Sequence, residues 1–143
     1  MELNRYVLGR LSKRLKQVYD CVPKSKVIAD VGTDQGYLAV ALVAGEKANH
    51  VIASDVHEGP LASAKAYCES VAYGSQVHCR LGNGLSVLAP NEADTVVLCG
   101  MGGYLMKEIL QKAPYAPSVL VVQPQNGQTE LKQYIVGSGY TIQ

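Results

Sequence analysis

The stretch Lys26-Val27-Ile28-Ala29-Asp30-Val31-Gly32-Thr33-Asp34-Gln35-Gly36-Tyr37 decides the fold. Its first half is an apolar run rich in β-branched residues that ends in an acid, and its second half is a turn punctuated by glycine. The apolar residues that follow, 38–43, predict the start of a helix. Strand, glycine turn and helix together form the opening unit of a nucleotide-binding α/β domain, in which the ligand lies across the carboxyl end of the first strand.

An acid within this turn helps to separate two classes of ligand. A dinucleotide site favours glycine near position 34, because pyrophosphate binds bare backbone amides at a helix N-terminus. The carboxylate of Asp34 would repel phosphate, whereas S-adenosylmethionine (SAM) presents an ammonium and a sulfonium that acids favour. The spacing Asp30-x-Gly32-x-Asp34-x-Gly36 is that of the SAM-methyltransferase loop with its middle glycine replaced. An ordinary strand-to-helix turn is the alternative.

Length and composition indicate one globular domain. The chain has 143 residues, of which 48% are hydrophobic and 17% are charged, and this composition excludes a disordered chain. The net charge of +1 hides a basic N-terminal segment, which predicts a polyanionic partner. Charges interrupt the N-terminus, so no signal peptide is expected, and the longest apolar run, 37–45, is too short to cross a bilayer. We therefore expect a soluble, cytoplasmic protein with no membrane contact.

Cysteines and histidines show no pattern of metal ligands. The cysteines have no C-x-x-C spacing and lie in predicted helices and strands, so we expect reduced, buried thiols at Cys21, Cys68, Cys79 and Cys99. The histidines are scattered without ligand spacing, and we expect surface or loop positions for His50, His57 and His78. No metal is predicted.

An amphipathic, basic helix is predicted from about Glu2 to Asp20. Its apolar stripe consists of Leu8, Leu11, Leu15, Val18 and Val22. The cations that fall largely on the other side are Arg10, Lys13, Arg14 and Lys16. They form either a solvated face or a surface that contacts phosphates, and the sequence leaves both open. Pro23 ends the helix.

Strands and helices alternate along the rest of the chain. The expected strands are 51–54, 77–81, 94–99 and 118–123, with a turn at 48–50 and the beginning of a sixth strand at 140–143. The expected helices are 58–73, 104–110 and 129–136. This alternation predicts an α/β fold with a parallel, doubly wound sheet.

Three positions after these strands bear on the ligand. Asp55 closes the second strand about 20 residues beyond the glycine turn, where such folds place an acid on the ribose hydroxyls of SAM or NAD alike. Asn83 can accept a hydrogen bond from the exocyclic amine of adenine, although a plain Asn-Gly turn is an equal alternative. The glycine-rich run 100–103 suggests a close approach of the backbone to a ligand.

With these residues, the chain resembles the bacterial tRNA (adenine-N1)-methyltransferase family TrmK, which modifies the adenine at position twenty-two of certain tRNAs. The resemblance covers nearly the whole chain. The motifs that carry it are 10–19, 28–38, Gly59-Pro60, 82–85, 99–103 and Gln123-Pro124. The Asp-Val-Gly-Thr-Asp turn combined with Gly-Met-Gly-Gly is far more specific than a general Rossmann fingerprint.

The resemblance implies a Rossmann-like class I SAM-dependent methyltransferase domain over residues 1–143, with SAM as cofactor and tRNA as partner. It implies that the cofactor-binding residues are Asp30, Gly32, Thr33, Asp34, Gly36, Tyr37, Asp55, Val56, Asn83 and Gly84. The residues implied around the methyl group and the target base are Gly100, Met101, Gly102, Gly103, Gln123 and Pro124. RNA binding falls to Arg10, Lys13, Arg14 and Lys16. Tyr37 and Tyr104 are candidates for stacking an extruded base, with core or rim positions as the alternative.

Departures from the family pattern leave other functions open. Gln35 stands where the family usually has histidine, and Asn83 where it usually has aspartate. The family continues into two further strands and a helical C-terminal domain, so we expect a C-terminally incomplete domain whose fifth strand, 118–123, is a bare edge open to self-association. The alternatives are a NAD-type Rossmann oxidoreductase, which Asp34 disfavours, and a SAM-binding module without turnover.

Overall fold

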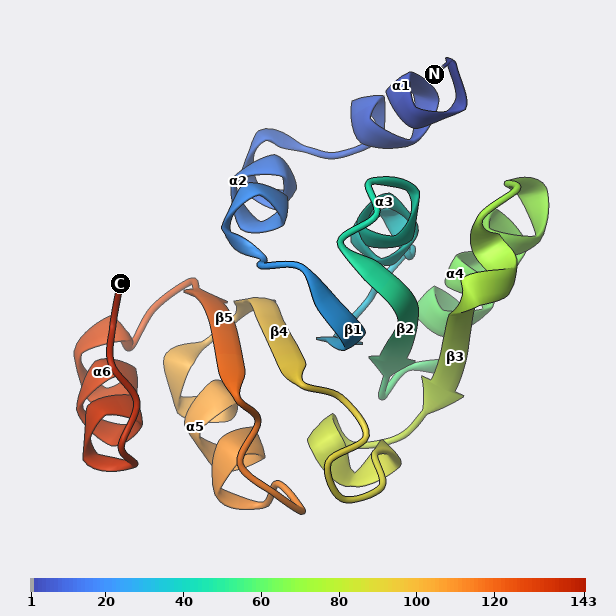
Figure 1. Cartoon of the computed structure of the whole chain (residues 1–143). Helices are drawn as coiled ribbons and strands as arrows, with labels where there is room; N and C mark the ends of the chain where they lie inside the picture. The colour runs from blue at the N-terminus through green and yellow to red at the C-terminus, as the bar shows by residue number, and fades with distance from the viewer. Residues whose placement is uncertain (1) are drawn as a thin grey trace.

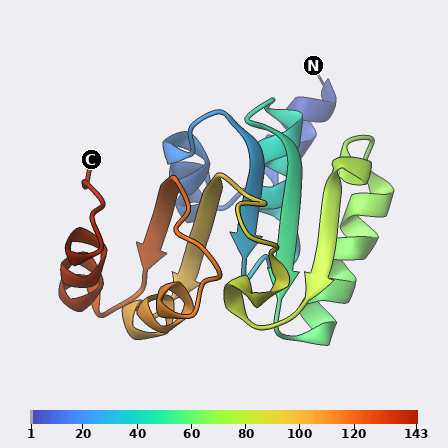
Figure 2. The ribbon, with the colours of Figure 1, turned by 60° about the horizontal axis from the view of Figure 1, so that its bottom comes forward.

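A single parallel sheet organises the protein. The computed structural model describes the backbone of residues 2–143 and the side chains of residues 5–143. The strands lie in the order β3-β2-β1-β4-β5 (Figure 1). Their bounds are β1 (Ser25–Val31), β2 (Ala48–Asp55), β3 (Val77–Leu81), β4 (Thr95–Met101) and β5 (Val119–Pro124). Figure 2 shows the five arrowheads at one edge, where the order reverses between β1 and β4 and where ligands bind in sheets of this kind.

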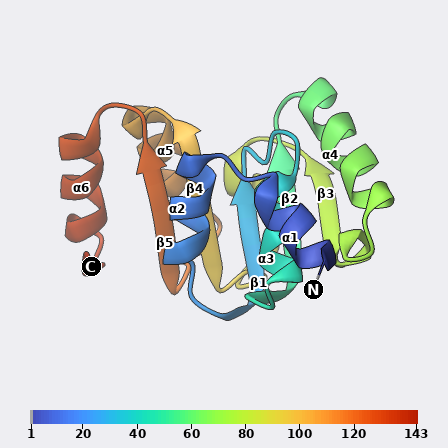
Figure 3. The same ribbon diagram turned by 90° about the horizontal axis from the view of Figure 1, so that it is seen from above.

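Helices cover both faces of this sheet. Their bounds are α1 (Glu2–Gly9), α2 (Lys13–Cys21), α3 (Tyr37–Ala44), α4 (Glu58–Ser70), α5 (Gly103–Gln111) and α6 (Gln128–Gly137), with 3-10 turns η1 (Gly74–Gln76) and η2 (Gly84–Val87). The first four helices share one hydrophobic cluster, and α5 and α6 share the other (Figure 3). Helix α3 is buried over residues 38–44, because the sheet lies on one side of it and α1, α2 and α4 contact the others.

Strand alternation assigns each side chain to one of these two clusters. Ile28 belongs to the α1–α4 cluster and Ala29 to the α5–α6 cluster, as the two-residue period of a strand requires. Asp30 follows Ile28 by two residues and therefore lies on the α1–α4 face at the carboxyl end of β1. Cys99 of β4 packs against that same cluster.

The predicted N-terminal helix is wrong in one respect: the segment forms two helices. Helix α1 ends at Gly9 and α2 begins at Lys13, with Ser12 as its N-cap, whose hydroxyl accepts a hydrogen bond from the amide of Leu15 at 3.2 Å. A glycine followed by a capping serine is a helix-break signal, and the continuous apolar stripe masked it. The stripe residues all pack in the α1–α4 cluster, together with the fully buried Val7.

Other predicted boundaries also need correction. Residues 48–50, expected as a turn, belong to β2, and β4 runs on through Gly100 to Met101. The expected sixth strand at 140–143 is absent from the described structure, where this segment pairs with no strand. The Tyr140 hydroxyl donates to the carbonyl of Pro117 at 2.6 Å and so joins the segment to the loop before β5. Strand β5 is an edge of the sheet, as expected.

The remaining expectations concern thiols, metals and membranes. All four cysteines are free, but only Cys68 is buried as expected: Cys79 and Cys99 are partly buried, and Cys21 is exposed at the end of α2. His50 and His78 are exposed on neighbouring strands β2 and β3 rather than in loops. Among the described residues no group of three or more side chains suits a metal ion. No helix within residues 2–143 is long and apolar enough to cross a membrane.

Candidate active site

The most buried charge at the carboxyl edge of the sheet belongs to Asp30, which is 3% exposed. Among residues 5–143, only Thr33 donates a hydrogen bond to this carboxyl, from its hydroxyl to Oδ2 at 2.9 Å. Burial raises the pKa of Asp30 to about 6, against a lowering by the Thr33 hydrogen bond, and the nearby Asp55 carboxylate raises it further. A buried acid with one hydrogen-bond donor is suited to accept a cation.

The turn after β1 is held in left-handed backbone conformations. Gly32, Asp34 and Gly36 have φ angles of 75°, 56° and 79°. A Cβ atom at Gly32 would lie 3.1 Å from the Cε atom of Met101, so only glycine keeps the space between β1 and the β4 loop clear. Asp34 is exposed in this turn, consistent with its expected place beside a ligand.

Asp55, the expected ribose ligand, already bonds two backbone amides. Its Oδ2 accepts from the amide of Asp34 at 3.1 Å, and its Oδ1 accepts from the amide of His57 at 2.9 Å. The side chain therefore joins the turn after β1 to the turn after β2. The Oδ1 atom also lies 3.2 Å from the Nδ1 atom of His57, so the capacity for a hydroxyl donor remains at Oδ2, which has a single partner in the described structure. Val56, beside it, is 58% exposed.

The loop after β3 carries the expected adenine-side residues Asn83 and Gly84. Asn83 is exposed, and Gly84 adopts a φ of 58° with Ile109 of α5 packed against it. Arg80 supports this loop through two hydrogen bonds of 2.7 Å to Glu92 and one of 2.8 Å to the carbonyl of Val87. Hydrogen bonds from Arg80 lower the pKa of Glu92 to about 2. The ion pair thus holds the chain on both sides of η2.

The glycine-rich segment after β4 lies opposite Asp30. Its register with β5 shifts between Cys99 and Met101, and Gly100 takes a φ of 76° at the bulge. The amide of Gly100 donates to the Oε1 atom of Gln123 at 3.2 Å, and the Cys99 thiol donates to the same oxygen at 3.5 Å. Gln123, expected across the base pocket, is thus turned toward β4 and holds the bulge.

Arg14 is the site residue that sequence reasoning placed elsewhere. A Cβ atom at Gly100 would lie 3.4 Å from both terminal guanidinium nitrogens of Arg14, so the guanidinium covers the bulge. Helix α2 contacts β5 on this face of the sheet, as Figure 3 shows. Burial raises the pKa of the Cys99 thiol, with Arg14 lowering it and Asp30 raising it, so all three groups are close together. The LSKR stretch gave no signal of this placement.

The segment beyond the bulge is interlocked with the loop after β5. The amide of Gly103 donates to the carbonyl of Asn126 at 2.8 Å, and a Cβ atom at Gly102 would lie 2.8 Å from the Asn126 side-chain oxygen. Tyr104 follows with its ring against Gly127 and is 60% exposed. It is a rim tyrosine, with one face free at the carboxyl edge. Pro124 pairs in register with Met101.

The comparison with family models decides the class of protein to which this site belongs. The model described as "Methyltransferase domain" matches residues 11–143. The chain belongs to this methyltransferase family. The match leaves out helix α1 and begins in the break before α2. The NAD-type oxidoreductase, kept open by the sequence, is set aside.

Relatives of this methyltransferase domain share its fold and much of its sequence. It is 33% identical over 136 residues to the tRNA (adenine(22)-N(1))-methyltransferase of Bacillus subtilis, covering 93% of the chain and 57% of the relative. The crystal structure of the B. subtilis M1A22 tRNA methyltransferase TrmK is 34% identical with a TM-score of 0.86, over 93% of the chain and 58% of that protein. The structure of M. capricolum TrmK with S-adenosyl-homocysteine is 30% identical with a TM-score of 0.84, over 93% and 60%. The chain thus spans about three fifths of these relatives.

The N-terminal cations of the methyltransferase domain have different neighbours. The Arg10 guanidinium donates to the Tyr37 hydroxyl at 2.7 Å and lies 4.8 Å from the centre of the same ring, with Tyr6 and Tyr67 within 6 Å. The Tyr37 hydroxyl donates in turn to Gln35 at 2.7 Å. Arg10 and Tyr37 therefore fix the break between α1 and α2 onto α3 and α4. All four cations of the predicted RNA surface are exposed; Lys13 and Lys16 lie apart from the tyrosines and from Gly100, and Lys16 is 3.8 Å from Asp20.

Proposed function

We propose that this domain binds SAM and transfers its methyl group to N1 of an adenine in tRNA. One observation carries the proposal: a buried acid, Asp30, and a cation, Arg14, flank an uncharged glycine turn at the switch point of a methyltransferase fold. The relatives that bear the tRNA (adenine-N1)-methyltransferase name are 33–34% identical over most of the chain. They supply the reaction class, and the residues of this chain supply its chemistry.

The residues present fit SAM at both ends of the molecule. Asp30 is placed for the α-ammonium of the methionine part and Arg14 for its α-carboxylate, because each offers the opposite charge at close quarters. The turn at Gly32 leaves room for the chain between them. Asp55 and Asn83 then serve the ribose and the adenine, as the sequence predicted. Asp34, Val56 and Gly84 line the path between these ends.

The proposed chemistry asks for alignment rather than for a base. SAM supplies a methyl group activated by a sulfonium. Adenine N1 carries a free lone pair, so no side chain of the domain needs to remove a proton before attack. Gly100 and Gly102 add no side chains to the turn, so the backbone lies close to the Arg14 guanidinium and the Asn126 side chain, and no charged group of the turn itself faces the target base. Holding the reactants in line can contribute about 7–11 kcal/mol to lowering the barrier.

For tRNA, the proposal rests on Lys13 and Lys16 together with Tyr104. The two lysines are exposed on α2, the helix that also carries Arg14, so phosphates bound there would lie beside the methyl-transfer site. The free face of Tyr104 at the opposite rim suits a stacked base. A tRNA substrate also implies that the protein acts in the cytoplasm.

The test is incubation with SAM and two tRNA transcripts, one with adenine at position twenty-two and one with guanine there, followed by mass spectrometry of the nucleosides. We expect 1-methyladenosine in the first transcript alone. Asp30→Asn should abolish the product, and Asp20→Asn, an exposed acid on α2, should not. Unchanged nucleosides together with saturable SAM binding would replace the proposal with a SAM-binding module without turnover.

A charge-reversal test addresses the RNA surface separately. Lys13→Glu with Lys16→Glu should weaken tRNA binding and flatten its dependence on salt by roughly 0.7–0.9 in slope for each lost contact. Affinity for SAM should not change, because neither lysine contacts the site residues. An unchanged salt slope would remove α2 from the RNA surface and leave the methyl-transfer proposal intact.

A further inference from the structure

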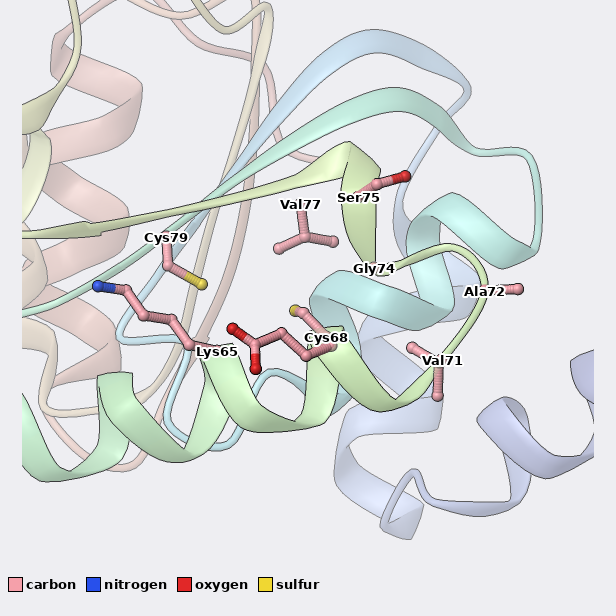
Figure 4. A pocket seen from close by; sticks show the side chains of 9 residues that line it. Lys65, Cys68, Val71, Ala72, Gly74, Ser75, Val77 and Cys79 are labelled. Atoms are coloured by element: carbon pink, nitrogen blue, oxygen red, sulfur yellow. The ribbon is translucent and has the colours of Figure 1, made fainter.

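A second group of reactive side chains lies away from the proposed methyl-transfer site, between α4 and the edge strand β3. It surrounds a surface pocket of about 390 Å³. Figure 4 shows Cys68 of α4 and Cys79 of β3 with their sulfur atoms turned toward each other across this pocket, and Lys65 beside them. Neither cysteine takes part in the proposed reaction.

The two thiols have different roles because of where they sit. Cys68 is 8% exposed, and its sulfur faces that of Cys79 at the pocket (Figure 4). The neighbouring Cys68 thiol, with the charge of Lys65, lowers the pKa of Cys79 to about 7 against the opposing effect of burial. The neighbouring Cys79 sulfur and burial together raise the pKa of Cys68. The titratable groups facing Cys79 are Lys65, Cys68 and Glu69, all from α4.

Access to the pair comes through the pocket. Cys79 is only half-buried, and β3 has no strand on its outer side in the described part of the chain. A small oxidant can therefore reach the Cys79 sulfur from the pocket, and Cys68, which lines the same pocket, is the more buried of the two thiols. This is the arrangement of a nucleophilic thiol with a resolving thiol.

We propose that Cys68 and Cys79 form an oxidation site for hydroperoxides, in which Cys79 reacts first and Cys68 closes a disulfide. The Cys79 thiolate attacks the peroxide oxygen, the O–O bond breaks, and a sulfenic acid and hydroxide form. The Cys68 thiol then loses its proton to hydroxide and attacks the sulfenyl sulfur, which releases a second hydroxide that is protonated to water. In sum, two thiols and one hydrogen peroxide give one disulfide and two waters.

Such a disulfide would tie together two elements that lead into the proposed cofactor site. Helix α4 starts just after Asp55, and β3 runs into the loop that holds Asn83. Disulfides in reducing compartments are mostly transient and regulatory. Oxidation of the pair needs neither SAM nor tRNA, so its test does not depend on the proposed activity.

The experiment treats the reduced protein with a small excess of hydrogen peroxide and maps the thiols by peptide mass spectrometry. We expect loss of two hydrogens in a linked pair of peptides containing Cys68 and Cys79, reversed by dithiothreitol. Cys68→Ser should leave Cys79 as a sulfenic acid that dimedone traps. Cys79→Ser should prevent oxidation at Cys68. Cys21→Ser, at an exposed thiol on α2, is the matched control and should change nothing.

A second measurement reads the reactivity of Cys79 directly. Its alkylation by iodoacetamide should rise about tenfold between pH 6 and pH 8, against roughly 75-fold for an ordinary thiol with a pKa near 8.5. The proposal is overturned if the peroxide-treated protein links Cys21 or Cys99 instead, or if Cys79 is oxidised to sulfinic acid without ever pairing with Cys68. It is equally overturned if Cys68→Ser and wild type give the same product.

Discussion

The two halves of the carboxyl edge of the sheet differ in the charge of the residues they present. The half formed by β1 and β2 places two buried acids, Asp30 and Asp55, at the carboxyl ends of these strands. The half formed by β4 and β5 offers glycines and the amide of Gln123, with Cys99 as its one ionisable side chain within the two strands. Arg14 reaches the border between the halves from α2.

Under the proposed function, this difference separates binding from reaction. The fixed charge of the first half would recognise a charged cofactor, and it costs stability through desolvation. The glycine turn of the second half adds no charge, and its cost is steric, because the turn tolerates few side chains. The two halves should therefore fail in different ways when changed.

The largest expected effect is that of Asp30→Asn on the first half. The loss of a charge-assisted contact of roughly 1.5–3 kcal/mol should weaken SAM binding about 10- to 150-fold. Stability of the free protein at pH 7 should rise, by up to about 3 kcal/mol, because a buried charge with a raised pKa is removed. Calorimetry and thermal unfolding measure the two changes. A variant that bound SAM normally would contradict the role of Asp30.

Gly103→Ala should disturb the structure of the second half and leave the first half unchanged. A Cβ atom there would lie 2.5 Å from the carbonyl oxygen of Gly127 and 2.8 Å from that of Asn126, and backbone atoms cannot move aside cheaply. We expect a loss of about 1–3 kcal/mol of stability and most of the methyl transfer, with SAM affinity within about threefold of wild type. Gly137→Ala, at a glycine with open space around it, is the control. Equal losses in affinity and turnover would remove the distinction between the halves.

The pH dependence of SAM binding sharpens the comparison further. Because the pKa of Asp30 is raised to about 6, the acid gains its charge between pH 5 and pH 7, and SAM affinity should rise about tenfold over that range and then level off. Stability of the free protein should run the other way. The contribution from this group is fully present below about pH 4 and is lost as the pH rises through 6. Asp30→Asn should remove both slopes.

A smaller effect is expected for the ion pair that supports the loop after β3. Arg80 and Glu92 are each about one-third exposed, so their pair should contribute only about 1–2 kcal/mol. The pKa of Glu92 is lowered to about 2, so this contribution is present above about pH 4.5 and is lost as the pH falls toward 2. Glu92→Gln should destabilise the protein near neutral pH and flatten its acid unfolding. Identical acid unfolding in both proteins would show that the pair adds nothing.

The smallest expected effect concerns the outer strand of the second half. Strand β5 pairs with β4 alone among the described residues and has no charged residue from Val119 to Val122. We propose weak self-association through its free backbone groups. Light scattering over a concentration series should show a mass that rises with concentration. A constant monomer mass up to high concentration would contradict this proposal.

Much of this site could be predicted because its parts are local in sequence. The segment from Asp30 to Gly36, the acid at 55 and the glycines at 100–103 each lie at or just beyond the end of a strand, and parallel strands bring their carboxyl ends together. Arg14 could not be assigned in this way, since its position depends on how α2 packs over β5. The hydrogen bonds that Asp55 accepts from two backbone amides could not be predicted either, because the sequence shows an acid but not its donors.

The N-terminal segment is a second case in which the packing of helices could not be predicted from the sequence. A periodic stripe predicted helix correctly but not the break after Gly9. The stripe also could not show the neighbours of the four exposed cations: Arg10 lies among tyrosines and Arg14 beside Gly100.

The tyrosine cluster around Arg10 also gives the protein an intrinsic spectroscopic probe. The chain has no tryptophan and no phenylalanine, so its near-ultraviolet signal comes largely from nine tyrosines. Tyr6, Tyr37 and Tyr67 surround one guanidinium, and the rings of Tyr37 and Tyr67 meet edge to face at 4.9 Å. Circular dichroism in this range should therefore follow the docking of α1 on the rest of the domain, without any added label.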